Sequence, residues 1–221
     1  IGLDYYWDKE PEVQARQRES FSRQLQLAKK LDKPVIIHSR DAAKDTLDVM
    51  AAEGGSQLRA VIHCFSYTKE TAREFQKWDY YFGIGGVLTF KNAKKLKEAA
   101  AELPMERILL ETDCPYLAPE PYRGKRNSSL YLPQVVAALA EIKGLTCQEI
   151  EDITWHNGYR FYGFYKRIYL PPYKPHVCCC RPLAPGGLPS KKHTPRYLRP
   201  VAMMRLHSWY TETHTNILPY S

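Results

Sequence analysis

The sequence predicts an α/β fold with a parallel sheet, and it favours a (β/α)8 TIM barrel over a doubly wound sheet. Helical and strand-like segments alternate through residues 1–164, as they do when crossover helices join parallel strands. No glycine-rich phosphate-binding motif follows a predicted strand, so the commonest cofactor signals of doubly wound sheets are missing. Several successive strands end in polar side chains instead, which is typical of the active rim of a barrel.

Four short apolar runs are predicted to be strands because β-branched residues cluster in them without alternating with polar residues. They cover residues 35–38, 60–63, 80–86 and 107–113. Strands of this composition are buried on both faces, so we expect helices to cover the sheet.

The intervening segments have apolar residues at helical spacing and recognisable end signals. Asn92 and Asp41 precede two of these segments and suit the N-cap position, and Pro104 should stop the helix that begins after Asn92. The predicted helices cover residues 12–31, 42–52, 69–78, 92–103, 132–143 and 147–161.

The net charge of +8 is confined to one end of the chain. Residues 1–164 contain as many acidic as basic side chains, so the whole excess lies in residues 165–221. The high isoelectric point is therefore a poor guide to what the main body binds.

The six cysteines include no C-x-x-C pair, so neither a zinc ribbon nor a thioredoxin-type site is indicated. This pattern favours reduced thiols in a cytoplasmic protein. No apolar run is long enough to cross a bilayer, so we expect no membrane partner.

The composition changes at Tyr165, where we place the boundary between a barrel-like part, residues 1–164, and a tail, residues 165–221. The tail contains nine of the sixteen prolines and a single acid, Glu212. Basic residues among tyrosines would suit nucleic-acid binding. Translation of a non-native reading frame explains the same composition, and in either case we expect the tail to be disordered.

Three predicted strands end in metal-capable side chains, which are His38, His63 and Asp113. In a barrel such residues converge at one rim. Glu111 shares a face with Asp113, and two acids on one buried face need a cation or a partner. The pattern alone leaves open both a metal site and ordinary hydrogen-bonded histidines.

Five sequence blocks surround these residues. They read IGLDYY at 1–6, PVIIHSRD at 34–41, VIHCFS at 61–66, LETDCPYL at 110–117 and RGKRN at 123–127. These blocks resemble those of the TatD family of deoxyribonucleases and occur in the order and at the spacing of that family. The resemblance reaches from Ile1 to about Tyr162.

The resemblance implies a (β/α)8 barrel that binds a pair of divalent metal ions, Mg²⁺, Mn²⁺ or Zn²⁺, and hydrolyses DNA phosphodiester bonds from single-stranded 3′ ends. His38 and His63 match metal ligands of the family. Asp113 matches the catalytic aspartate that binds metal and handles the proton of the attacking water. Because the RGKRN block follows the last predicted strand, its Arg123, Lys125 and Arg126 would be placed to contact phosphate oxygens, although a solvated turn is the other interpretation.

The chain also departs from the family pattern. Nothing in it matches the early strand with two histidines one residue apart, nor the metal-bridging glutamate that would precede Ile1. We therefore expect an N-terminally truncated barrel that lacks about three strands. Without those ligands, the chain should be a poor nuclease.

Two other functions compete with this hypothesis. One is a metal-dependent hydrolase on the same barrel that acts on a small amide or ester, although the RGKRN block favours phosphate. The other is a non-catalytic remnant that binds nucleic acid through its basic tail.

The expectation that the tail is disordered can be tested by limited proteolysis. Residues 165–221 lack apolar periodicity, so a protease should cut there before it cuts the helices of residues 1–164. Mass spectrometry of the early fragments identifies the sites. Cleavage of both parts on the same timescale would contradict the prediction.

Overall fold

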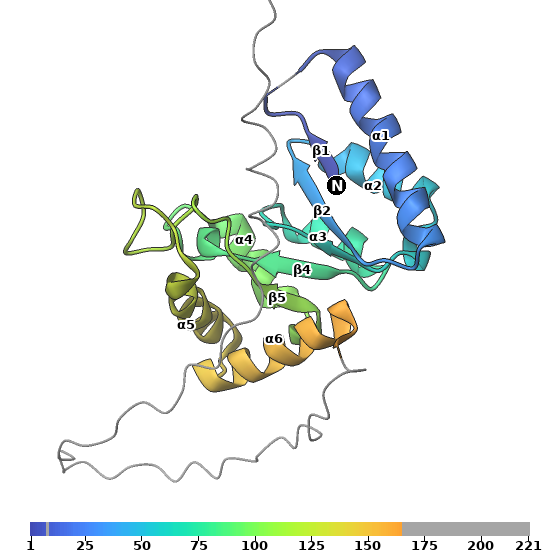
Figure 1. Cartoon of the computed structure of the whole chain (residues 1–221). Helices are drawn as coiled ribbons and strands as arrows, with labels where there is room; N and C mark the ends of the chain where they lie inside the picture. Colours follow the sequence, from blue (N-terminus) through green and yellow to red (C-terminus); the bar gives the residue numbers. More distant parts are fainter. Residues whose placement is uncertain (8, 165–221) are drawn as a thin grey trace, which may run out of the picture.

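The computed structural model describes residues 1–7 and 9–164, and the predicted tail lies outside them. Five parallel strands form one sheet in the order β1-β2-β3-β4-β5 (Figure 1). Each strand thus lies beside its neighbour in sequence, as in a (β/α)8 barrel, and the predicted fold class is confirmed. The strands are β1 (Gly2–Asp4), β2 (Val35–Arg40), β3 (Ala60–Ile62), β4 (Tyr81–Ile84) and β5 (Ile108–Leu110).

Six α-helices connect or follow the strands, close to the predicted ranges. Figure 1 shows α1 and α2 near β1 and β2, and α5 and α6 at the other end of the sheet. The helices are α1 (Pro11–Lys30), α2 (Ala43–Ala52), α3 (Lys69–Gln76), α4 (Lys94–Glu102), α5 (Leu132–Lys143) and α6 (Cys147–Tyr162). Short 3-10 turns cover Gly55–Gln57, Gly86–Thr89, Met105–Arg107 and Ser129–Tyr131.

Both predicted helix caps are wrong. The N-cap of α4 is Ala93, and no side chain caps this end, so Asn92 lies one residue before the cap. The N-cap of α2 is Ala42. Asp41 has a φ of 53°, a left-handed conformation that aspartate tolerates better than most residues, and it belongs to the turn before the helix.

The two faces of the sheet bury separate sets of apolar residues. The face toward helices α1 to α5 belongs to the main core and includes Leu3, Ile37, Ile62, Phe82 and Ile108. The opposite face buries a smaller group, Val61, Tyr81 and Leu109, against Phe161 of α6, with Ile36 and Tyr162 at its margin. Helix α6 therefore fills the part of the sheet's second face that precedes the strand ends.

One buried polar side chain ties α6 to the sheet. Asn157 is 2% exposed, and its Nδ2 donates hydrogen bonds to the carbonyl oxygens of Met105 at 2.7 Å and Ile108 at 2.9 Å. These carbonyls stand at the start of β5. The amide therefore fixes the helix at the end of β5 opposite Asp113.

Replacement of Asn157 by alanine should destabilise the chain. It removes both donors; the carbonyl of Met105 keeps the amide of Ile108 as a donor, whereas the carbonyl of Ile108 loses its bond to Asn157. The expected cost is about 1–3 kcal/mol, which corresponds to a Tm loss of roughly 2–10 °C. Thermal unfolding measures this loss. The control Asn92→Ala changes an exposed side chain and should leave the Tm within about 2 °C. A large loss of Tm in Asn92→Ala would show that Asn92 does cap α4.

Candidate functional site

The candidate site lies where the second face of the sheet changes from apolar to polar. Side chains alternate along a strand, so His38 shares its face with Ile36, and His63 shares its face with Val61. Ile36 pairs with Val61 across β2 and β3, and the amide of His63 donates to the carbonyl of Ile37 at 2.8 Å. His63 therefore follows the carboxyl end of β3, and His38 lies in the second half of the adjacent β2, which continues to Arg40 instead of ending at His38 as predicted.

His63 is held between two carboxylates that come from the end of β5. Its Nδ1 lies 3.0 Å from Oε2 of Glu111, and its Nε2 lies 3.3 Å from Oδ1 of Asp113. The side chains of His63 and Glu111 are about 10% and 11% exposed, whereas that of Asp113 is 30% exposed. Burial alone would lower the pKa of His63, but hydrogen bonds to Asp113 and Glu111 outweigh it and raise the pKa to about 10.

His38 has a different partner. Its Nε2 lies 3.0 Å from Oδ2 of Asp4, which ends β1, and the other oxygen of Asp4 accepts a hydrogen bond from the amide of Tyr6. Asp4 was not singled out from the sequence. The signal was available, because Asp4 also follows a short apolar segment at the end of a strand in the first family-like block.

These residues form two separate groups rather than one compact site: His63 with Glu111 and Asp113, and His38 with Asp4. Within residues 1–7 and 9–164, no three or more histidine, cysteine, aspartate or glutamate side chains are placed to hold one metal ion together. The structure brings Asp113 to His63 and leaves His38 with Asp4. The assignment of His38, His63 and Asp113 as metal ligands therefore stays a prediction.

The chemistry of the group around His63, with Glu111 and Asp113, fits part of a metal site. Metal-binding histidines commonly donate one ring nitrogen to a carboxylate and turn the other toward the ion. His63 has this arrangement, with Glu111 on Nδ1 and Asp113 facing Nε2. A mixed imidazole and carboxylate set suits Zn²⁺, Mn²⁺ and, with more water, Mg²⁺.

The three predicted phosphate-binding side chains are all exposed, in the loop that follows β5. The guanidinium of Arg123 stacks over the ring of Phe90 at 4.3 Å. The buried Asn127 anchors the end of this loop, because its Nδ2 donates to the carbonyl of Tyr116 at 2.7 Å. Lys125 and Arg126 lie between these fixed points, so the loop presents positive charge beyond the end of β5. Asn127 stood out in the sequence only as part of a block, and its anchoring role was missed.

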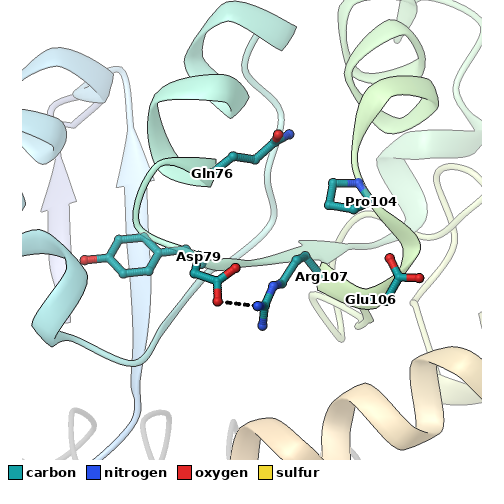
Figure 2. A pocket seen from close by; sticks show the side chains of 6 residues that line it. Gln76, Asp79, Pro104, Glu106 and Arg107 are labelled. Atoms are coloured by element: carbon teal, nitrogen blue, oxygen red, sulfur yellow. Dashed lines mark hydrogen bonds and ion pairs between the residues drawn. The ribbon is translucent and has the colours of Figure 1, made fainter.

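A hollow of about 320 Å³ lies far from these residues along the strands (Figure 2). Asp79 and Tyr80, which precede β4, line it together with Pro104, Glu106 and Arg107, which precede β5. Arg107 forms an ion pair with Asp79 inside it. The hollow is therefore at the amino ends of the strands, whereas active sites of barrels lie at the carboxyl ends.

The family model described as TatD related DNase matches residues 1–163. The chain belongs to this family. The predicted resemblance is thereby confirmed over the whole described part of the chain except Phe164.

Two curated TatD relatives are named as uncharacterized metal-dependent hydrolases. YabD of Bacillus subtilis is 46% identical over 162 residues, which cover 73% of this chain and 63% of the relative. YcfH of Escherichia coli K12 is 41% identical over 161 residues, which cover 73% of this chain and 60% of the relative. The chain thus spans less than two thirds of their length, and metal-dependent hydrolysis is the family's shared description.

Solved structures agree with the fold. The TatD homolog YJJV from Escherichia coli K12 superposes with a TM-score of 0.68 at 32% identity, covering 74% of this chain and 62% of that one. A TatD family hydrolase from Entamoeba histolytica superposes with a TM-score of 0.63 at 22% identity, covering 73% of this chain and 61% of that one, which supports the fold alone. The five strands are therefore part of a TatD-type α/β architecture.

Proposed function

We propose that this chain is part of a divalent-metal-dependent deoxyribonuclease that hydrolyses phosphodiester bonds of single-stranded DNA in the 3′ to 5′ direction. The observation that carries the proposal is the arrangement of His63. One ring nitrogen is held by the buried Glu111 and the other faces Asp113, at the carboxyl ends of β3 and β5. Membership of the TatD related DNase family supports the same activity.

His38, His63 and Asp113 would hold the metal, as a pair of Mg²⁺, Mn²⁺ or Zn²⁺ ions. When bound, such ions lower the pKa of a water molecule and neutralise charge on the phosphate. The side chain of His38 is 46% exposed and that of Asp113 is 30% exposed, so both donors are reachable from solvent.

Asp113 is the residue we assign to proton transfer. A general base must reach both its structural partners and the water that attacks the substrate. Asp113 meets this requirement, because it contacts His63 through Oδ1 and is partly exposed. Glu111 does not, because its side chain is about 11% exposed and its two oxygens accept hydrogen bonds from His63 and Cys64, the two residues that follow β3.

The basic loop supplies the reason to prefer a phosphate ester over a small amide or ester. Arg123, Lys125 and Arg126 are exposed in the loop that follows β5, and they suit contacts with several phosphate groups of a strand. The free thiols of Cys64, Cys114 and Cys147 support a cytoplasmic location.

The catalytic assignment predicts the effect of Asp113→Asn. The test uses a hybrid protein in which this chain is joined to the part of YabD that lies outside the region matched by this chain. The chain matches only 63% of that relative. The amide keeps the size of the side chain and removes the base, so turnover should fall by about 10² or more. Steady-state cleavage of a 3′-labelled single strand with saturating Mg²⁺ or Mn²⁺ measures turnover, and thermal unfolding checks the fold.

Asp41→Asn is the matched control for this measurement. Asp41 has a left-handed φ of 53°, which asparagine also tolerates, so activity should stay within a few-fold of the parent. Equal turnover of the parent and Asp113→Asn would refute the catalytic role. Hydrolysis of small amides or esters without DNA cleavage would favour the other hydrolase class, and salt-sensitive DNA binding without any hydrolysis would favour the remnant.

The basic loop predicts a separate effect on DNA binding. Changing Arg123, Lys125 and Arg126 together to alanine should weaken binding of a single-stranded oligonucleotide and flatten its dependence on salt, by about 0.7 in log–log slope for each phosphate that the variant no longer binds. Fluorescence anisotropy at several salt concentrations measures both. The control changes Lys94, Lys95 and Lys97 of α4, and an equal effect there would show that only net charge matters.

A further inference from the structure

The contact between Glu111 and His63 crosses an entire strand. Glu111 follows β5 and His63 follows β3, while β4 lies between these strands in the sheet. Neighbouring strands are about 4.8 Å apart, so β3 and β5 are separated by roughly 10 Å. Nevertheless Oε2 of Glu111 lies 3.0 Å from Nδ1 of His63. The carboxylate therefore extends over β4 to reach the end of β3.

Gly83 of β4 leaves the space for this crossing. A Cβ atom at Gly83 would lie 2.2 Å from Oε2 and 2.4 Å from Cδ of Glu111, closer than real Cβ contacts come. Gly83 is not among the glycines with positive φ, so its backbone conformation does not require glycine. Its missing side chain is needed only because the Glu111 carboxylate occupies that place.

The carboxylate of Glu111 satisfies two donors at once. Oε2 faces Nδ1 of His63, and Oε1 accepts a hydrogen bond from the backbone amide of Cys64. Cys64 has a φ of 47°, a left-handed conformation that few residues other than glycine adopt. Glu111 thus holds both the ring of His63 and the unusual turn directly after it.

We propose that Glu111, reaching across Gly83, is a positioning residue that fixes the ring of His63 with Nδ1 turned inward and Nε2 turned toward Asp113. The proposal rests on the proposed function in treating Nε2 of His63 as a metal-binding atom. Glu111 acts through His63 and does not touch the substrate, because both its oxygens are used by donors of the chain and its side chain is buried.

A double-mutant cycle tests whether Gly83 serves Glu111. The variants are Gly83→Ala, Glu111→Ala and the two changes together, measured by thermal unfolding of the 221-residue chain. With Glu111 present, the added methyl displaces the carboxylate and should lower the Tm by several degrees, roughly 4 °C or more. With alanine at position 111 the same methyl has room, so its effect should shrink to less than about 2 °C. Equal losses in both backgrounds would overturn the proposal.

A second measurement tests the effect on His63 itself. His63 Nδ1 and the Cys64 amide face different oxygens of Glu111, and glutamine replaces one of these oxygens with an NH2 donor, so Glu111→Gln cannot accept at both places. In NMR spectra, at least one of those two proton signals should move strongly. Affinity for Zn²⁺, measured by competition with a chelating dye, should fall about 10- to 100-fold. Glu102→Gln, at the end of α4, removes a carboxylate that binds surface Arg73 and Lys69, and it should change neither.

The zinc-affinity measurement, together with the double-mutant cycle and the NMR signals, separates this inference from the proposed function. If the parent chain binds no Zn²⁺, the proposed metal role of His63 loses its support, while the cycle and the NMR signals still decide whether Glu111 positions the ring. If the parent binds Zn²⁺ and Glu111→Gln leaves its affinity and both proton signals unchanged, the positioning role is overturned and the proposed function stands.

Discussion

The buried carboxylate of Glu111 constrains the candidate site more than any other group. A carboxylate that is removed from water without compensation destabilises a protein by several kcal/mol, so its surroundings must supply donors. Here the donors are the ring of His63 and the amide of Cys64, both at the end of β3. Glycine at position 83 is the third requirement, because any side chain there would separate the acid from its donors.

The polar site depends equally on the apolar layer below it. Phe161 of α6 packs against Val61, Tyr81 and Leu109, which fill the second face of the sheet before the strands end. Asn157 fixes the same helix to the start of β5. The strands are therefore held rigidly at one end, and the residues that follow their other ends can carry polar side chains.

The strands and helices were predictable from sequence because their signals are local. Apolar runs such as residues 35–38 and 60–63 marked buried strands, and proline and glycine marked helix ends. The caps at Asn92 and Asp41 were mispredicted because each residue lies one position before the observed N-cap, in the turn that precedes the helix. The roles of Gly83 and Glu111 were not predictable, since they depend on the register of three strands far apart in sequence.

The groups around His63 and His38 differ in the contacts that metal binding would replace. At His63, Nδ1 would stay with Glu111, and an ion at Nε2 would replace the contact with Asp113, which is itself a carboxylate donor. At His38, Nε2 now contacts Asp4, so an ion at that nitrogen would replace this contact. That pair is partly exposed, and exposed ion pairs contribute only about 0–1 kcal/mol. Exchange of the His38 contact for a metal–nitrogen bond thus costs the fold little, whereas loss of the Glu111 contact would leave a buried charge without its donors.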